Sequence, residues 1–168
     1  MSMWQTLDDA IYTQAVTDMG STATLPVKTF MVAEWWDGKP VDENGNAIQL
    51  PLMVIGSHTT AESDVDEYGC TIAPNLTVVY KYLLSVSLSH ADRRQAKRDA
   101  QTMRARLIGA VKALYPLTQY DTDDDAVLAL TWHESYIQMR GPQVLTTSPE
   151  KVWLATAYLA FDFETTGG

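Results

Sequence analysis

An alternating stretch, "LTVVYKYLLSVSLS" at residues 76–89, constrains the fold of this chain more than any other segment. Every even position from Leu76 to Leu88 is apolar, whereas the odd positions are mostly Thr, Lys and Ser. This alternation predicts a strand about 40 Å long, since an extended chain rises roughly 3.3 Å per residue. One face of the strand should be buried and the other much wetter. A sheet built on it needs helices on one face only.

A long helix is predicted directly after this strand. Ser89 and Asp92 match a capping box, and Pro116 ends the helical pattern after Tyr115. Within this helix, over residues 91–115, apolar residues recur every three or four positions, which predicts a face that packs on the sheet. These residues are Ala96, Ala100, Met103, Leu107, Val111 and Leu114.

Three more elements are predicted at the two ends of the chain. Residues 6–20 have the pattern of a helix, because Thr6 can cap it and Gly20 can end it. Two strand-like runs, 127–139 and 152–164, lie near the C-terminus. They should complete the sheet.

The region before the alternating stretch predicts two strands, at 27–36 and 48–57. An Asn-Gly pair at 44–45 lies between them and is a strong hairpin signal. Pro51, inside the second run, indicates an edge position or a bulge. The next segment, 58–75, is polar, acidic and poor in aliphatic residues, so a long surface loop is predicted there.

The order of these elements predicts an α+β fold. The expected architecture is a two-layer sandwich, with two helices on one face of a mainly antiparallel or mixed sheet of about five strands. At 168 residues the chain has an ordinary size for one domain and can bury about two-thirds of its unfolded surface. No internal repeat or low-complexity segment divides it, so residues 1–168 are expected to form a single domain.

Charge is unevenly distributed along the chain. Its net charge is −9, yet seven of its 12 Lys and Arg lie between Arg93 and Lys112, and two of its 21 Asp and Glu lie within 90–114. That segment therefore carries +5 and the remainder −14. The acidic total argues against general affinity for nucleic acid or anionic membranes, because its field repels phosphates. The N-terminus lacks the pattern of a secretory signal, and a soluble protein with no membrane partner is expected.

The motifs that resemble metal sites fail on residue type or spacing. "DTDDD" at 121–125 matches the first ligands of a calcium loop, but Ala126 stands where Gly is needed and Trp132 where the bidentate Glu belongs. His133-Glu134 lacks the second His of a zinc-protease helix. If His133 and Glu134 lie in a strand, their side chains are expected on opposite faces.

The remaining polar candidates also lack partners in the sequence. Ser57 precedes His58 without the G-x-S-x-G elbow of a nucleophile, and Cys70 has no Cys or His at metal spacing. As the only cysteine, Cys70 cannot form an intramolecular disulfide. We therefore expect no enzymatic activity, no catalytic residue, no cofactor and no bound metal.

The outer side of the basic helix is the strongest candidate functional surface. Ala105, Gly109 and Ala113 line up opposite the apolar stripe, with cations beside them. A mid-helix Gly costs about 1 kcal/mol relative to Ala, so Gly109 indicates close packing against something outside the helix. A solvated charged face is the simpler alternative. The candidate subunit interface comprises Arg94, Arg98, Gln101, Ala105, Gly109 and Lys112, and its expected partner is another copy of this acidic chain.

The layout resembles the tail terminator, or tail completion, proteins of long-tailed bacteriophages. The matching segments are "TLDDAIYTQAV", the strand–helix unit "VVYKYLLSVSLSHADRRQAKRDAQTMRARLIGAVKAL" and the terminal strand "VWLATAYLAFDFETTGG". In that family an N-terminal helix precedes a sheet, a long strand runs directly into a long helix, and two further strands close the chain. The resemblance covers most of the chain in the order of its elements.

The resemblance implies a structural virion protein of the phage tail or neck, assembled in the host cytoplasm. Its copies would form a ring, commonly a homohexamer, that caps the tail tube in head–tail joining. The partners would be the tail tube protein and the connector protein, and DNA would pass through the lumen without specific binding. An acidic lumen would keep phosphates from adhering. Two alternatives stay open: another neck or tail component, such as a connector stopper or tube-like protein, and an unrelated α+β enzyme or small-ligand-binding domain.

Overall fold

The structure, a computed structural model, describes residues 3–33, 36, 38, 41, 44–65, 71–114, 126–144 and 150–167. Within these ranges, the side chains of 3–6, 58–65, 71–78, 126–129 and 165–167 are not described. The helices are α1 (Met3–Gly20) and α2 (Arg93–Ala113). The strands are β1 (Thr29–Val32), β2 (Leu52–Val65), β3 (Thr71–His90), β4 (Ala126–Gln143) and β5 (Val152–Gly167), and α2 lies between β3 and β4 in the sequence.

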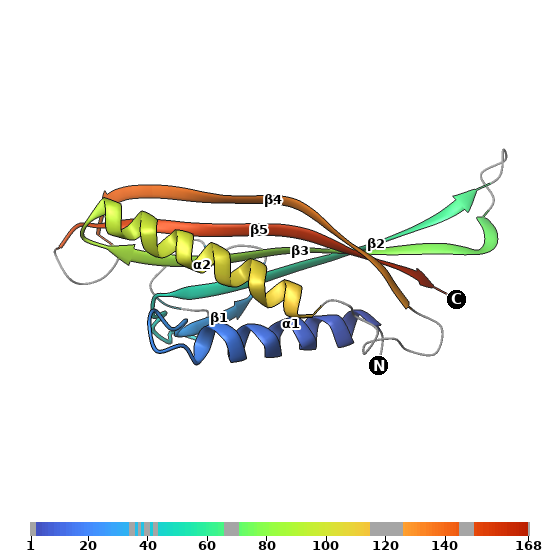
Figure 1. Ribbon diagram of the computed structural model, residues 1–168, viewed down its shortest axis with the longest axis horizontal. Helices are drawn as coiled ribbons and strands as arrows, with labels where there is room; N and C mark the ends of the chain where they lie inside the picture. The colour runs from blue at the N-terminus through green and yellow to red at the C-terminus, as the bar shows by residue number, and fades with distance from the viewer. Residues whose placement is uncertain are drawn as a thin grey trace.

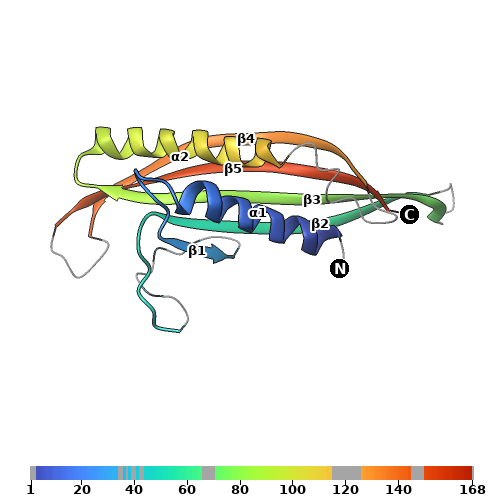
Figure 2. The ribbon, with the colours of Figure 1, turned by 60° about the horizontal axis from the view of Figure 1, so that its bottom comes forward.

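The five strands form one mixed sheet in the order β1-β2-β3-β5-β4. All neighbouring strands are antiparallel except β1 and β2, which are parallel. Both helices lie on the same face, α2 over β3 and β5 and α1 beside α2 (Figures 1 and 2). The two-layer α+β fold expected from the sequence is therefore confirmed. Neither helix of the described ranges is long and apolar enough to cross a bilayer.

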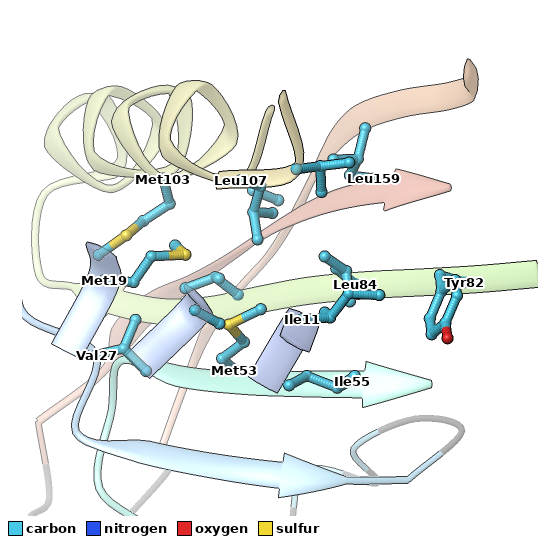
Figure 3. Packing of buried hydrophobic residues seen from close by; sticks show 14 of the residues in the cluster. Ile11, Met19, Val27, Met53, Ile55, Tyr82, Leu84, Met103, Leu107 and Leu159 are labelled. Atoms are coloured by element: carbon cyan, nitrogen blue, oxygen red, sulfur yellow. The ribbon is translucent and has the colours of Figure 1, made fainter. Parts of the chain in front are cut away.

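The core lies between the helices and the even-numbered face of β3. Tyr80, Tyr82, Leu84, Val86 and Leu88 are all buried, as the alternation predicts. The six residues of the predicted helix stripe are buried as well, from Ala96 in α2 to Leu114 at its C-cap. Figure 3 shows side chains of both helices pointing to Met53, Ile55 and Leu84 on the sheet.

The junction between β3 and α2 is short, as expected, but the N-cap of α2 differs from the prediction. β3 ends at His90 and α2 begins at Arg93, with Asp92 as the N-cap. The Asp92 side chain accepts a hydrogen bond of 3.0 Å from the backbone N–H of Arg94. The predicted box between Ser89 and Asp92 is therefore wrong, because Asp92 occupies the capping position itself. The Thr6 cap is also wrong, since α1 already begins at Met3.

The predicted hairpin between the first two strands is wrong, because β1 and β2 run parallel. The intervening chain, 33–51, is long enough to return to the end from which β1 started. The Asn-Gly pair lies within a small local turn closed by a single bridge between Val41 and Ala47. Pro51 is neither an edge nor a bulge residue: it precedes β2, and its carbonyl accepts a 2.9 Å hydrogen bond from the N–H of Lys28.

The predicted loop at 58–75 is also wrong, because most of it forms an antiparallel hairpin. β2 continues to Val65 and β3 begins at Thr71, with a register irregularity between Ser63 and Val65. The hairpin extends well past both helices (Figure 1). An antiparallel ladder satisfies backbone hydrogen bonds whatever the side chains are, so polar composition does not prevent strands that are anchored in a larger sheet.

Candidate functional site

The six residues of the candidate subunit interface lie on the side of α2 that faces away from the sheet. Arg94, Arg98, Gln101, Ala105, Gly109 and Lys112 are all exposed. A Cβ atom at Gly109 would have no atom within 4 Å, so packing inside the described protomer does not require glycine there. The interface itself stays a prediction, since exposure alone also fits a solvated helix face.

Some cations of α2 hold the fold together. The Arg106 guanidinium donates hydrogen bonds to the carbonyl oxygens of Thr24 and Leu25, at 2.9 and 3.0 Å. Arg104 Nε donates to Ser135 Oγ on β4, at 2.6 Å. These two side chains tie α2 to the segment after α1 and to an edge strand.

The other cations of the basic segment divide into one that has an aromatic partner and four that have none. Arg93 lies over the Trp153 ring, 5.4 Å from its centroid, where a cation–π contact is favourable. Four side chains form no hydrogen bond or ion pair with any described residue: Arg94, Lys97, Arg98 and Lys112. Three of these four, Arg94, Arg98 and Lys112, belong to the candidate subunit interface on the outer face of α2.

The face of the sheet opposite the helices, here called the far face, carries a hollow of about 440 Å³. Near the start of β2 this face is buried, at Val54, Ser85 and Thr156 on three neighbouring strands, but it opens at Leu83, which is 39% exposed. Gly56 and Ala160 lie in register beside Leu83 on the neighbouring strands. The rim includes Lys81, His133 and Asp162.

A stacked tyrosine pair extends the apolar surface beside this hollow. Tyr136 on β4 and Tyr158 on β5 are register partners whose rings stack with centroids 4.7 Å apart. Burial raises the pKa of Tyr136 above its ordinary value, and Tyr158 and Glu134 raise it further. The two stacked rings form a flat patch on the far face.

His133 and Asp162 form an ion pair when the imidazole is protonated. Nε2 of His133 lies 2.6 Å from a carboxylate oxygen of Asp162, and His133 sits at a register irregularity between Trp132 and Glu134. A bulge changes the direction in which side chains point, so His133 and Glu134 both lie on the far face. Glu134 is the register partner of Ala160, which belongs to that face. The expectation that they point to opposite faces is therefore wrong.

Ser57 borders the hollow, but its side chain lies on the helix-covered face, beside its register partner Tyr82 and hydrogen-bonded to Asp8, so it cannot pair with His133 as a nucleophile. Ser57 is on β2 and His133 on β4, and β3 and β5 lie between them. Three strand spacings amount to about 14 Å, far beyond hydrogen-bond reach. Within the described ranges, no three His, Cys, Asp or Glu residues are grouped to hold a metal ion. The 121–125 run, Cys70 and the side chain of His58 lie outside the described residues.

A second titratable pair joins α1 to the sheet: Asp8 on α1 is half-buried, and Tyr82 on β3 is buried. The Tyr82 hydroxyl donates a 2.7 Å hydrogen bond to Asp8 Oδ1. Burial raises the pKa of Asp8 above its usual 3.8, while the Tyr82 bond opposes that rise and Asp9 adds to it. Burial, followed by the bond to Asp8, also raises the pKa of Tyr82. The bond joins α1 to β3 and so positions the helix on the sheet.

The sequence interpretation missed the hollow, although one signal for it was present. Leu83 is the apolar residue that interrupts the polar odd positions in "YKYLLSVS". The pairing of His133 with Asp162 had no such signal, because it depends on the register of β4 against β5 and on a bulge.

No family model matches the chain, and no curated protein was found to be similar to it. Among solved structures, a chain of "Virion of native gene transfer agent (GTA) particle" is similar over 96% of this chain and 95% of that chain. The sequence identity is 13% and the TM-score is 0.44. A likeness this weak identifies neither a family nor a function.

Proposed function

We propose that the chain is a structural, non-enzymatic subunit of a phage-like virion whose copies form a ring around the DNA path. The role that fits best is that of a tail terminator, which caps the tail tube in the neck. The observation that carries the proposal is the placement of its elements. A one-sided sheet has β3 running directly into α2, and the β2–β3 hairpin extends past both helices (Figure 1).

The charge distribution supports assembly with further copies. A ring of three or more copies requires each subunit to offer two different, complementary patches. The outer face of α2 offers cations that the described protomer leaves unpaired, and the rest of the chain is strongly acidic. Arg94, Arg98, Gln101, Ala105, Gly109 and Lys112 belong to the cationic patch. The ring is a homohexamer in this proposal, and it contacts the tail tube protein and the connector protein.

Cryo-electron microscopy of particles that contain this chain tests the proposal. The expected result is a closed ring of this chain between the tail tube and the connector, with DNA passing through its lumen. The neighbours of the ring distinguish a terminator from a connector stopper or a tube-like protein. A single copy, or a location away from the DNA path, would contradict the proposal.

A further inference from the structure

We propose that the hollow on the far face of the sheet receives the outer face of α2 from a second copy of this chain. The floor of this docking hollow consists of Gly56, Leu83 and Ala160. The inference rests on the proposed ring, and it names the two surfaces that meet between neighbouring subunits.

The two surfaces lie on opposite sides of one protomer. α2 packs its apolar stripe on one face of the sheet, so its outer face points away from that sheet (Figure 2). The docking hollow lies on the other face, where Gly56, Leu83 and Ala160 are register neighbours. Copies can therefore stack in one direction, each helix against the sheet of the next copy. Such a contact is heterologous, and heterologous contacts close into a ring when the rotation between copies permits it.

The shapes of the two surfaces correspond. Leu83 stands 39% exposed between the small residues Gly56 and Ala160. On α2 the middle of the outer face has Ala105 and Gly109, with open space above Gly109. An apolar side chain can enter the gap that these small residues leave, and close approach of the helix then removes Leu83 from water.

The charges of the two surfaces are complementary. Around the docking hollow, the far face carries three carboxylates, Glu134, Asp162 and Glu164, against Lys81, and Asp162 is already paired with His133. α2 brings four cations that have no partner among the described residues. Opposite charges fix the orientation of such a contact, and Arg can bind a carboxylate through two parallel hydrogen bonds. A nucleic acid would instead be repelled by the carboxylates.

Site-specific cross-linking tests the contact directly. In a Cys70→Ser background, Leu83→Cys and Gly109→Cys are placed on separate chains and also together on one chain. After oxidation of the assembled protein, the mixture of the two single variants should give a covalent dimer. The double variant should give a ladder of covalent oligomers that ends at the size of the ring. Gly109→Cys fits the protomer, because its Cβ meets no atom within 4 Å.

The matched control pairs Gly109→Cys with Val32→Cys, a 70% exposed residue on the edge strand β1, and should give no ladder. If the wild-type chain forms rings but positions 83 and 109 do not cross-link, the docking inference is wrong and the proposed ring stands. If the chain forms no oligomer, alone or in particles, both proposals are wrong.

Charge reversal gives a second, independent test. Arg98→Glu and Glu134→Arg should each prevent assembly, because each places like charges across the contact, whereas the two together should restore it. Lys28→Glu, an exposed change of the same sign away from both surfaces, should assemble normally. Assembly of both single variants at wild-type level would overturn the docking inference.

Discussion

Arg106 shows how single residues of the basic segment serve the fold. It fastens α2 to the carbonyl oxygens of Thr24 and Leu25, whereas Lys97, nine positions earlier on the same helix, is exposed and has no partner among the described residues. The two side chains carry the same charge but have different environments. Substitution should therefore separate a structural cation from one that the protomer does not need.

We expect Arg106→Met to lower the free energy of unfolding by about 1–3 kcal/mol, since hydrogen bonds from a charged donor are lost. Lys97→Met should change it by less than about 0.5 kcal/mol, as is usual for exposed positions. Urea unfolding of the two variants measures both values. Equal losses would show that Arg106 does not hold the segment after α1.

Substitutions of Gly109 distinguish effects on the stability of the protomer from effects on its assembly. Because a Cβ at this position meets open space, Gly109→Ala should raise the free energy of unfolding by about 0.5–1 kcal/mol through helix propensity. Gly109→Leu should also fold, but its bulk should prevent close approach of a second copy. Chemical unfolding and native mass spectrometry measure the two effects. Normal assembly of Gly109→Leu would instead indicate that the outer face of α2 is solvated.

At the scale of elements, the start of α2 depends on one carboxylate. Asp92→Ala should cost about 1 kcal/mol of folding free energy, because the N–H of Arg94 loses its acceptor. Ser89→Ala should cost much less, since Asp92 and not Ser89 is the cap. Thermal unfolding of both variants checks this order, and a larger loss for Ser89→Ala would reverse the assignment.

The packing of α1 on the sheet should depend on pH through Asp8. Because its pKa is raised above 3.8, the folded chain binds a proton at Asp8 at a higher pH than the unfolded chain does. This contribution to stability therefore increases as pH falls through the folded-state pKa, and it levels off below about 3.8.

Asp8→Asn replaces the titratable carboxyl group with an amide, whose oxygen can still accept the hydrogen bond from Tyr82. The free energy of unfolding of the wild type, minus that of Asp8→Asn, should thus become more positive between pH 7 and pH 4. Urea titrations over this pH range measure the difference. The contributions of the other carboxylates cancel, because they are the same in both proteins. A constant difference would mean that Asp8 titrates alike in both states.

The elements that the sequence predicted correctly are those with a buried face. The alternation at 76–88 and the stripe of α2 report burial directly, so strand, helix and their contact could all be predicted. The 58–65 part of β2 had no such pattern, because its pairing comes from backbone hydrogen bonds. β1 and its pairing with β2 were predicted, but the orientation of the pair was wrong, because the Asn-Gly turn signal indicates a hairpin whereas the two strands run parallel.

At the scale of the whole molecule, the cationic half of the candidate interface could be predicted and the acidic half could not. The outer face of α2 follows from helical geometry alone. The docking hollow depends on the strand order, which places β5 between β3 and β4 and so brings Ala160 and Asp162 beside Leu83 and Lys81. Distant segments meet there, and their meeting is a property of the complete sheet.

The mass of the assembled protein tests the central claim most directly. Native mass spectrometry of the purified chain over a wide concentration range, and of complexes released from particles, should show one closed species. We expect a mass of six times the 18.7 kDa of one chain, with no open series of larger sizes. A species of 18.7 kDa at every concentration and in every released complex would contradict the claim that this chain forms a ring.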